Sequence, residues 1–256
     1  MHQIPRSRFA SILAGAALLA AGLTPAARAE KFPALNTPAS TEHLTGKLVW
    51  ADLFTTNPDE ATRFYTGLLG WTSESLDQKG KGYTVFMNDG RPVAGLAPRR
   101  VSGSNHPARW IGYFAVSDLD ATLSSVTRNG GVIHAPSHKF PDRGYQAIVA
   151  DSDGTPVGLL QSSSGDAPDS EPRPGDWNWF ELYSKNPKET SSFYHATVGF
   201  DVAPETKSDR KSDFVLSSNG SARGGIAPLP AGGDEIRPAW LGVIRVADLD
   251  ATLAKV

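Results

Sequence analysis

The 256-residue sequence contains no cysteine, and this absence excludes disulfide bonds, lipid attachment through a cysteine and thiolate chemistry. An excess of one charge is also lacking, because 25 Lys and Arg balance 27 Asp and Glu to a formal net charge of −2. Nothing in these totals favours a nucleic acid or an anionic membrane surface as a partner. The composition, 39% hydrophobic and 20% charged, is typical of a globular chain and not of a disordered one.

The N-terminus has the three parts of a secretory signal peptide. Arg6 and Arg8 precede an apolar run over residues 9–23, and residues 27–29 (ARA) form an A-x-A cleavage site. The alternative is a membrane anchor, but the run is shorter than the roughly 20 residues that span a bilayer, and no charged stop follows it. We therefore predict cleavage after Ala29, a periplasmic or secreted protein, and no membrane contact after cleavage.

Two segments rich in Pro, Ser, Thr and Gly divide the chain behind the signal peptide at 1–29. Residues 30–46 are predicted to be a flexible lead-in, and residues 162–175 (SSSGDAPDSEPRPG) an interdomain linker. The linker separates a first domain at 47–161 from a second domain at 176–256.

The two domains repeat each other. Residues 50–70 (WADLFTTNPDEATRFYTGLLG) align without gaps on residues 179–199 (WFELYSKNPKETSSFYHATVG). Residues 110–123 (WIGYFAVSDLDATL) align in the same way on residues 240–253 (WLGVIRVADLDATL). Shared spacing over such a length indicates a duplication far more strongly than a short motif does.

Within the first domain the pattern predicts a strand, a helix and further strands, twice over. Asn57 is expected to cap the first helix, which ends at Gly70, and Asp89-Gly90 is a favoured hairpin turn. The expected strands are 48–55, 83–88, 92–98, 110–116, 145–150 and 156–161, and the expected helices are 60–69 and 119–128.

The motifs N-P-x-x-A/T-x-x-F-Y-x-x-x-x-G and V-x-D-L-D-A-T-L…G-G-V…D-S-D-G-T resemble the vicinal oxygen chelate superfamily of glyoxalases, bleomycin resistance proteins and dioxygenases. The strand that opens with Trp50 and the later W-x-G-Y resemble its metal-poor, two-domain members. The resemblance covers 47–161 fully and 176–256 in part. It implies an α+β fold of paired βαβββ modules that form half-open barrels around a concave pocket, whereas periodicity alone gives only α+β.

The second copy is expected to be incomplete. Leu123 is followed by 38 residues up to Gln161, but the matching Leu253 is followed by only three. We therefore expect a truncated second domain that lacks its last module, and an incomplete second pocket.

Members of the superfamily that use a metal carry His, Gln or Glu ligands at three places, in the first strand, the second-half strand and the last strand. The resemblance puts Trp50, Ile111 and Gly158 at these places, and Trp179 and Leu241 at the first two in the second copy. Because none of these side chains binds a cation, we predict no metal and no cofactor.

Alternation along the strands places Trp50, Asp52 and Phe54 on the concave face, together with Tyr113. Asp52, a carboxylate beside aromatic rings, is a weak candidate for a catalytic acid or base. The alternative for Asp52 is a structural charge that pairs with the backbone or with Arg109. Trp50 serves either as a ligand-binding surface or as core packing.

Other candidate ligand-binding residues lie outside these two strands. Trp179 and Glu181 repeat the aromatic and the acid in the second copy. Arg143 and Tyr145 are expected in a loop at the pocket mouth, where Arg143 would meet an anionic ligand. The alternative for Arg143 is a solvated charge.

Two further motifs are weaker. His134 and His138 form an H-x-x-x-H, but Pro136 between them disfavours a helix, so a loop without metal is expected. Asp151 and Asp153 resemble the start of a calcium loop whose later Glu is absent, so a tight turn is expected.

The leading hypothesis is an exported, metal-independent small-molecule binding protein of the glyoxalase and bleomycin-resistance type. Its partner would be a small organic ligand, held by aromatic stacking, rather than a nucleic acid or a membrane. Two alternatives stay open: a glyoxalase-like lyase, isomerase or dioxygenase-related enzyme, and a protein-interaction module. No oligomeric state follows from the sequence.

Overall fold

The computed structural model describes residues 32–76, 82–99, 108–205, 212–231 and 236–256. The predicted signal peptide and its cleavage site lie outside the described residues. Within these ranges, no helix is both long and apolar enough to cross a membrane.

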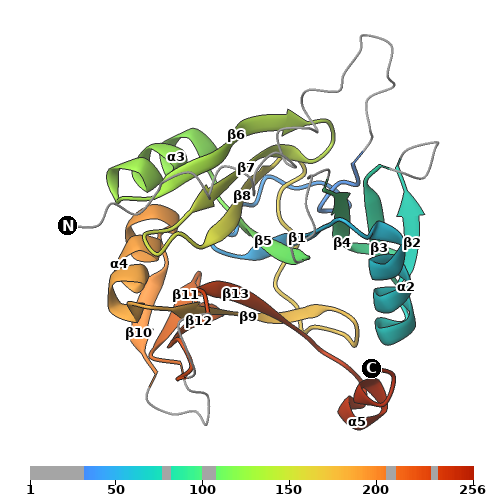
Figure 1. Ribbon diagram of the computed structural model, residues 1–256. Coiled ribbons are helices and arrows are strands. Elements are labelled where there is room, and N and C mark those ends of the chain that lie inside the picture. The colour runs from blue at the N-terminus through green and yellow to red at the C-terminus, as the bar shows by residue number, and fades with distance from the viewer. Residues whose placement is uncertain (1–31, 77–81, 100–107, 206–211, 232–235) are drawn as a thin grey trace.

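Eight strands form one mixed sheet in the order β2-β3-β4-β1-β5-β8-β7-β6 (Figure 1). The central strands β1 and β5 pair antiparallel, and each pairs in parallel with the last strand of its own module, β4 and β8. The first module comprises β1 (Leu48–Thr55), α2 (Pro58–Leu69), β2 (Thr72–Ser75), β3 (Thr84–Asn88) and β4 (Arg91–Pro98). The second comprises β5 (Arg109–Ala115), α3 (Leu119–Arg128), β6 (Val132–Phe140), β7 (Gly144–Ala150) and β8 (Pro156–Ser162). The α+β class and the paired βαβββ modules are therefore confirmed, in sheets that do not close into barrels.

A second sheet repeats the first module and the strand that follows it. Its order, β10-β11-β12-β9-β13, reproduces β2-β3-β4-β1-β5 element by element. The elements are β9 (Trp177–Ser184), α4 (Pro187–Val198), β10 (Asp201–Pro204), β11 (Phe214–Ser218), β12 (Ser221–Pro228), β13 (Ala239–Ile244) and α5 (Leu249–Leu253). The duplication visible in the sequence is therefore also a duplication of topology.

Local chemistry explains where α2 begins and ends. Pro58 fits the first turn because the N–H that proline lacks has no partner inside the helix there. Gly70 ends the helix at a left-handed φ of 73°, and its N–H donates to the Thr66 carbonyl. Asn57 stands at the predicted N-cap position, but its side chain accepts no backbone N–H, and its Nδ2 donates to Glu60 Oε2 (3.2 Å) instead.

The short strand β2 and the edge strand β6 were not predicted. His134 and His138, expected in a loop, lie on β6, and the His138 ring packs edge-on against Phe140 (4.7 Å between centroids). Pro136 is tolerated in this strand because β6 is at the edge of the sheet, where one side of the backbone needs no partner.

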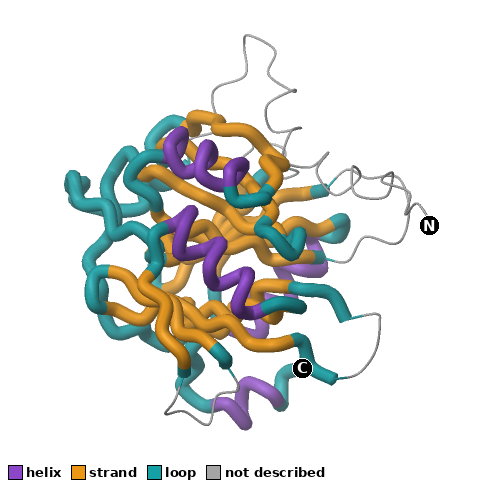
Figure 2. Tube along the Cα trace, turned by 90° about the vertical axis from the view of Figure 1, so that its left-hand side faces the viewer, coloured by secondary structure: helices purple, strands orange, loops and turns teal. Residues whose placement is uncertain are grey.

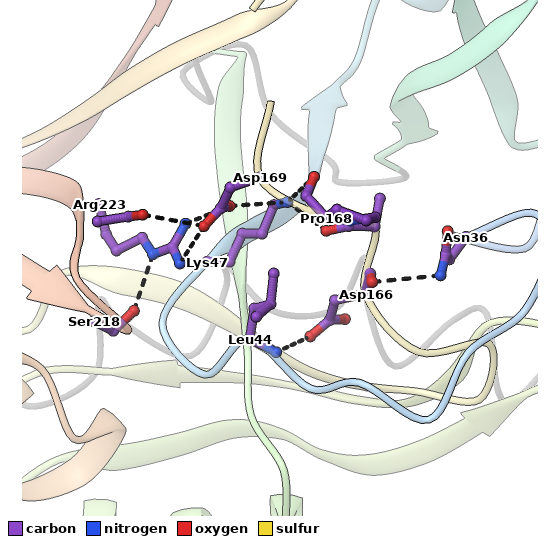
Figure 3. A network of polar contacts seen from close by, with 10 residues as sticks. Asn36, Leu44, Lys47, Asp166, Pro168, Asp169, Ser218 and Arg223 are labelled. Carbon is purple, nitrogen blue, oxygen red and sulfur yellow. Dashed lines mark hydrogen bonds and ion pairs between the residues drawn. The ribbon is translucent and has the colours of Figure 1, made fainter. Parts of the chain in front are cut away.

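The segment 32–46, expected to be flexible, packs against residues from the expected linker (Figure 3). The Leu35 N–H donates to Ser164 Oγ (3.1 Å), and the Leu44 N–H donates to Asp166 Oδ2 (2.7 Å). These side chains take up backbone donors that belong to no strand. Residues 32–46 are therefore an ordered strap across the first domain, and we call them the N-terminal strap.

One carboxylate joins Lys47, the residue that follows the strap, to the second half of the chain. Asp169 lies 3.1 Å from Lys47 Nζ and accepts two hydrogen bonds from the Arg223 guanidinium, at 2.7 and 2.8 Å (Figure 3). The Arg223 bonds and the Lys47 charge hold the pKa of Asp169 well below its usual range. Residues 162–175 are thus held on both sides by specific contacts.

The two halves share one hydrophobic core. Its buried side chains include Phe114 from the first sheet and Phe180 and Trp240 from the second. Helices α3 and α4 lie side by side on one side of the molecule (Figures 1 and 2). At another contact, Trp177 Nε1 donates to the Val93 carbonyl (2.9 Å). The packing therefore couples the repeats.

Candidate functional site

The first sheet is curved, because the single side chain of Phe32 contacts residues from two strands that are far apart in the strand order. The Phe32 ring lies 4.8 Å from that of Tyr83, next to β3, and 4.9 Å from that of Phe140 on β6. In a flat sheet β3 and β6 would be six strand spacings, about 29 Å, apart. Phe32, Tyr83 and Phe140 belong to or pack against one cluster of buried side chains, and this cluster therefore lies on a concave face of the sheet.

A polar group lies at the centre of this concave face. Asp52 Oδ1 accepts hydrogen bonds from Trp50 Nε1 (2.7 Å) and from the Tyr83 hydroxyl, and all three residues are buried. Gly95 on β4 pairs with Asp52 on β1, and a Cβ at position 95 would overlap the Tyr83 hydroxyl and the Asp52 carboxylate. The glycine therefore leaves the space in which the acid and the phenol meet.

Burial dominates the protonation of this group. It raises the pKa of Asp52, against the opposing effects of the Arg143 charge and of hydrogen bonds from Tyr83, Trp50 and Tyr113. Burial, reinforced by the neighbouring Asp52 charge, also raises the pKa of Tyr83 and Tyr113 well above the ordinary tyrosine value. A carboxyl that holds its proton more tightly than usual, beside two neutral phenols, is a candidate proton donor.

Arg143 is buried inside this cluster, with no exposed surface, although it was expected at the pocket mouth. Its guanidinium carbon lies 4.0 Å from the centroid of the Trp50 ring and 5.1 Å from that of Phe32. None of its three side-chain nitrogens has a hydrogen-bond partner. A buried cation without an acceptor is costly, whereas stacking on aromatic rings offsets only part of that cost.

The family's metal-ligand positions do not fit a metal here. Trp50, Ile111 and Gly158 lie on the neighbouring strands β1, β5 and β8, but Tyr113 pairs with Gly158 and its ring would overlap any Cβ there. The space of a third ligand is thus filled by a phenol ring. Across the described ranges, no group of three or more His, Asp or Glu side chains is placed to hold a metal ion.

The structure brings most of the predicted first-domain residues together. Trp50, Phe54 and Tyr113 belong to the buried concave cluster that surrounds Asp52. Tyr145 does not belong to it: its ring is 42% exposed and lies beneath Lys139 Nζ, at 5.3 Å. Successive side chains on β7 alternate between faces, so Tyr145 points away from the face that carries Ile148.

Arg109, considered as a partner for Asp52, is placed elsewhere. Its neighbouring charges are those of Arg99 and Arg237, and burial with this repulsion lowers the pKa of Arg109. The cation that acts on Asp52 is Arg143.

The second sheet carries a reduced copy of the polar group. Trp179 Nε1 donates to Glu181 Oε2 (2.6 Å), as Trp50 does to Asp52, and Ser212 Oγ donates to Glu181 Oε1 (2.6 Å) in the place of Tyr83. Gly225 pairs with Glu181 as Gly95 pairs with Asp52. Trp179 and Glu181 are half-buried in a different sheet, so they are not part of the first-domain site.

The predicted tight turn after β7 is confirmed. Asp151 Oδ1 accepts the N–H groups of Asp153 (3.0 Å) and Thr155 (2.8 Å), and the Tyr194 hydroxyl from α4 donates to Asp151 Oδ2 (3.0 Å). Burial nevertheless raises the pKa of Asp151 to about 6. The turn thus carries a buried acid at the contact between the two halves.

Sequence reasoning missed two residues of the site. Tyr83 has one available signal, since strict alternation puts it on the same strand face as Val85 and Met87. Phe32 has none, because it precedes every periodic segment and lies in a stretch whose composition favours a flexible chain.

Comparisons with known proteins agree with this architecture. Residues 47–159 match the model of the Glyoxalase/Bleomycin resistance protein/Dioxygenase superfamily. A relative called "Putative glyoxylase CFP32" from Mycobacterium tuberculosis is 30% identical over 221 residues, which are 85% of this chain and 84% of the relative. The "Anthracycline biosynthesis protein DnrV" from Streptomyces peucetius is 29% identical over 228 residues, 84% of this chain and 82% of that protein.

Solved structures share the fold. The Mn(II)-bound glyoxalase from Novosphingobium aromaticivorans superposes with a TM-score of 0.56 at 20% identity, covering 83% of this chain and 69% of that one. The 2,2',3-trihydroxybiphenyl 1,2-dioxygenase from Sphingomonas wittichii gives 0.55 at 15% identity, covering 82% and 77%. With its repeated modules, its family match and a 30% identical relative along most of its length, the chain belongs to the glyoxalase/bleomycin resistance protein/dioxygenase superfamily.

Proposed function

We propose that this protein binds a small organic molecule on the concave face of its first domain, without a metal ion, and that it works outside the cytoplasm. One observation carries the proposal: Arg143 is buried among aromatic rings with all its donors unpaired, beside the Asp52 carboxyl. Buried polar groups of this kind are expensive, and binding sites are where proteins retain them.

The metal-independent part of the proposal rests on side-chain chemistry. Trp50 and Ile111 have no donor atom for a hard or borderline cation, and the Tyr113 ring fills the space beside Gly158. Arg143 supplies a fixed positive charge on the same face, where it would attract electron-rich groups of a ligand.

The names of the relatives support small-molecule chemistry. They refer to a putative glyoxylase and to anthracycline biosynthesis, and each relative matches more than four fifths of this chain. Export is supported by the charged start, the apolar run and the A-x-A site before Glu30.

A second candidate function, that of an enzyme, is favoured by Asp52. Its carboxyl is buried, its pKa is raised, and the Tyr83 hydroxyl donates to it. Such a group could transfer a proton to or from a bound ligand. If the protein is an enzyme, the Asp52→Asn variant should still bind the ligand but no longer convert it. If the protein only binds, the wild type should leave every bound ligand chemically unchanged.

A thermal-shift screen tests binding, because a ligand that binds only the native state raises the melting temperature. The panel contains aromatic antibiotics, methylglyoxal adducts and divalent metals, and the variants are Trp50→Leu and, as the matched control, Trp179→Leu. We expect shifts with organic compounds that Trp50→Leu abolishes and Trp179→Leu retains, and no change on adding chelator. A stoichiometric metal, or a large drop with chelator, would contradict the proposal.

The location is tested separately. Mass spectrometry of protein from the periplasmic or secreted fraction should show a chain that begins at Glu30. An intact N-terminus on membrane-bound protein would contradict export.

A further inference from the structure

The concave cluster is covered by a residue from outside both modules. Phe32, in the N-terminal strap, is only 4% exposed, and its ring contacts Tyr83, Phe140 and the Arg143 guanidinium. The phenyl ring of Phe32 therefore covers the side of the site that no strand of the sheet covers.

The position of Phe32 is held by its side chain rather than by backbone pairing. Along the described part of the strap, the first hydrogen bond to the rest of the domain is the one from the Leu35 N–H to Ser164 Oγ, three residues beyond Phe32. The hollow beside it has a volume of about 480 Å³, within the range of small-molecule sites, and its lining includes Phe32, Asp142 and Ser163. The Phe32 ring can therefore leave the site without breaking a strand.

The charge of the site favours an anion. Arg143 has three buried nitrogens without an acceptor, and burial makes the neighbouring Asp52 carboxyl hold its proton more tightly than usual. The planar guanidinium fork matches a carboxylate through two parallel hydrogen bonds, and such charge-assisted bonds are about twice as strong as neutral ones.

We propose that the first-domain site takes a small aromatic carboxylate, whose carboxylate pairs with Arg143 while its ring replaces the side chain of Phe32. This inference rests on the proposed function and adds to it the class of ligand. The strap then acts as an internal competitor that keeps the apolar face covered when no ligand is bound.

Three ligands distinguish the contribution of the carboxylate charge to affinity from that of the aromatic ring. The full chain is titrated by calorimetry with benzoate, with the neutral benzamide and with the non-aromatic cyclohexanecarboxylate. Benzoate should bind about ten- to a hundredfold more tightly than benzamide, because only benzoate supplies a charge-assisted acceptor. Cyclohexanecarboxylate should bind several-fold more weakly than benzoate, because it lacks a flat π-face.

Two variants test the two contacts. Phe32→Ala should tighten benzoate binding by about three- to tenfold, because the binding-competent state no longer has to compete with the strap. Arg143→Met should abolish benzoate binding and raise the melting temperature, because an apolar chain replaces a buried guanidinium whose three nitrogens have no hydrogen-bond acceptor. The matched controls are Phe64→Ala and Arg245→Met, at an exposed ring and an exposed ion pair, and both should leave benzoate affinity unchanged.

The outcomes against the proposal are distinct from failure of the proposed function. Equal affinities for benzoate and benzamide, or retained benzoate binding in Arg143→Met, would overturn the carboxylate class even if the site binds other compounds. A lower melting temperature for Arg143→Met would make Arg143 a structural anchor and overturn the proposal. No benzoate binding to either the wild type or Phe32→Ala would overturn it too, while the broader thermal-shift screen decides whether the site binds anything.

Discussion

Tyr113 and Gly158 lie opposite each other on β5 and β8, and the Tyr113 ring occupies the space that any side chain at position 158 would need. The pairing fixes the chemistry of the site, because a phenol replaces what would otherwise be room for a projecting carboxylate. It also makes this glycine a position of packing and not of backbone flexibility, since its φ is not left-handed.

Gly158→Ala should therefore destabilise the protein by roughly 1–3 kcal/mol, the usual cost of overpacking a core. The matched control is Gly67→Ala in helix α2, where a Cβ would meet nothing within 4 Å. That substitution should be stabilising by about 0.5–1 kcal/mol, because alanine favours a helix over glycine. Denaturant unfolding of both variants provides the measurement. Equal effects would mean that the ring moves aside freely and that the third ligand place is open.

Asp151 should make stability depend on pH in a known direction. Burial raises its folded-state pKa from 3.8 to about 6, so the folded state binds the proton more tightly than the unfolded chain does. The resulting stabilisation is fully present below about pH 4 and is lost as the pH rises through about 6.

The test is the difference in unfolding free energy between the wild type and Asp151→Asn. Asparagine keeps acceptors for the Asp153 and Thr155 N–H groups but has no charge to bury. The wild type should lose roughly 2–3 kcal/mol relative to the variant between about pH 4 and pH 8. Parallel curves would show that Asp151 titrates in the folded protein as it does in the unfolded chain.

The repeats should unfold together. Phe114 from the first sheet meets Phe200 from the second half edge-on, with 5.5 Å between their centroids, inside the shared core. Phe200→Ala should cost about 3–5 kcal/mol and lower a single transition seen by calorimetry, circular dichroism and tryptophan fluorescence alike. Phe64→Ala, at a ring that is 46% exposed, is the control and should cost far less. Two separate transitions would mean that each repeat is stable alone.

The fold could be predicted from sequence wherever short-range periodicity acts. Helix α3 runs from Leu119 to Arg128, as predicted, and the hairpin turn at Asp89-Gly90 has the left-handed φ values of 49° and 74° that such turns require. Strand β2 escaped prediction because its four residues, Thr72–Ser75, are all exposed and carry no alternating pattern.

The residues of the site could be predicted only where alternation along a single strand places their side chains on the concave face of the sheet. Trp50 and Asp52 follow from alternation on β1, but the burial of Arg143 depends on a turn that folds back over Trp50, and no local pattern specifies that approach. Phe32 depends on contacts more than 100 residues away in sequence, such as the Leu35–Ser164 hydrogen bond that anchors its strap. Composition predicts a flexible segment there because it cannot register such contacts.

A change of charge at two neighbouring positions of β1 should have very different costs in stability, large at Leu53 and small at Asp52. Leu53 is 2% exposed and packs in a cluster with Trp71 and Phe86, on the face of β1 opposite to Asp52. Leu53→Asp puts an unpaired carboxylate among these rings, which costs several kcal/mol or raises the pKa of the new acid strongly. We expect the variant to be unfolded at neutral pH.

Asp52→Asn should instead cost only about 1 kcal/mol, because the amide oxygen can still accept from Trp50 Nε1 and Tyr83 and the new side chain brings no charge of its own into the core. Since burial raises the pKa of Asp52, the wild type should also lose stability relative to this variant as the pH rises. Melting curves of both variants across the pH range provide the comparison. If Asp52→Asn is as damaging as Leu53→Asp at every pH, the ionised carboxylate is needed by the folded core, and Asp52 is a structural anchor rather than a functional acid.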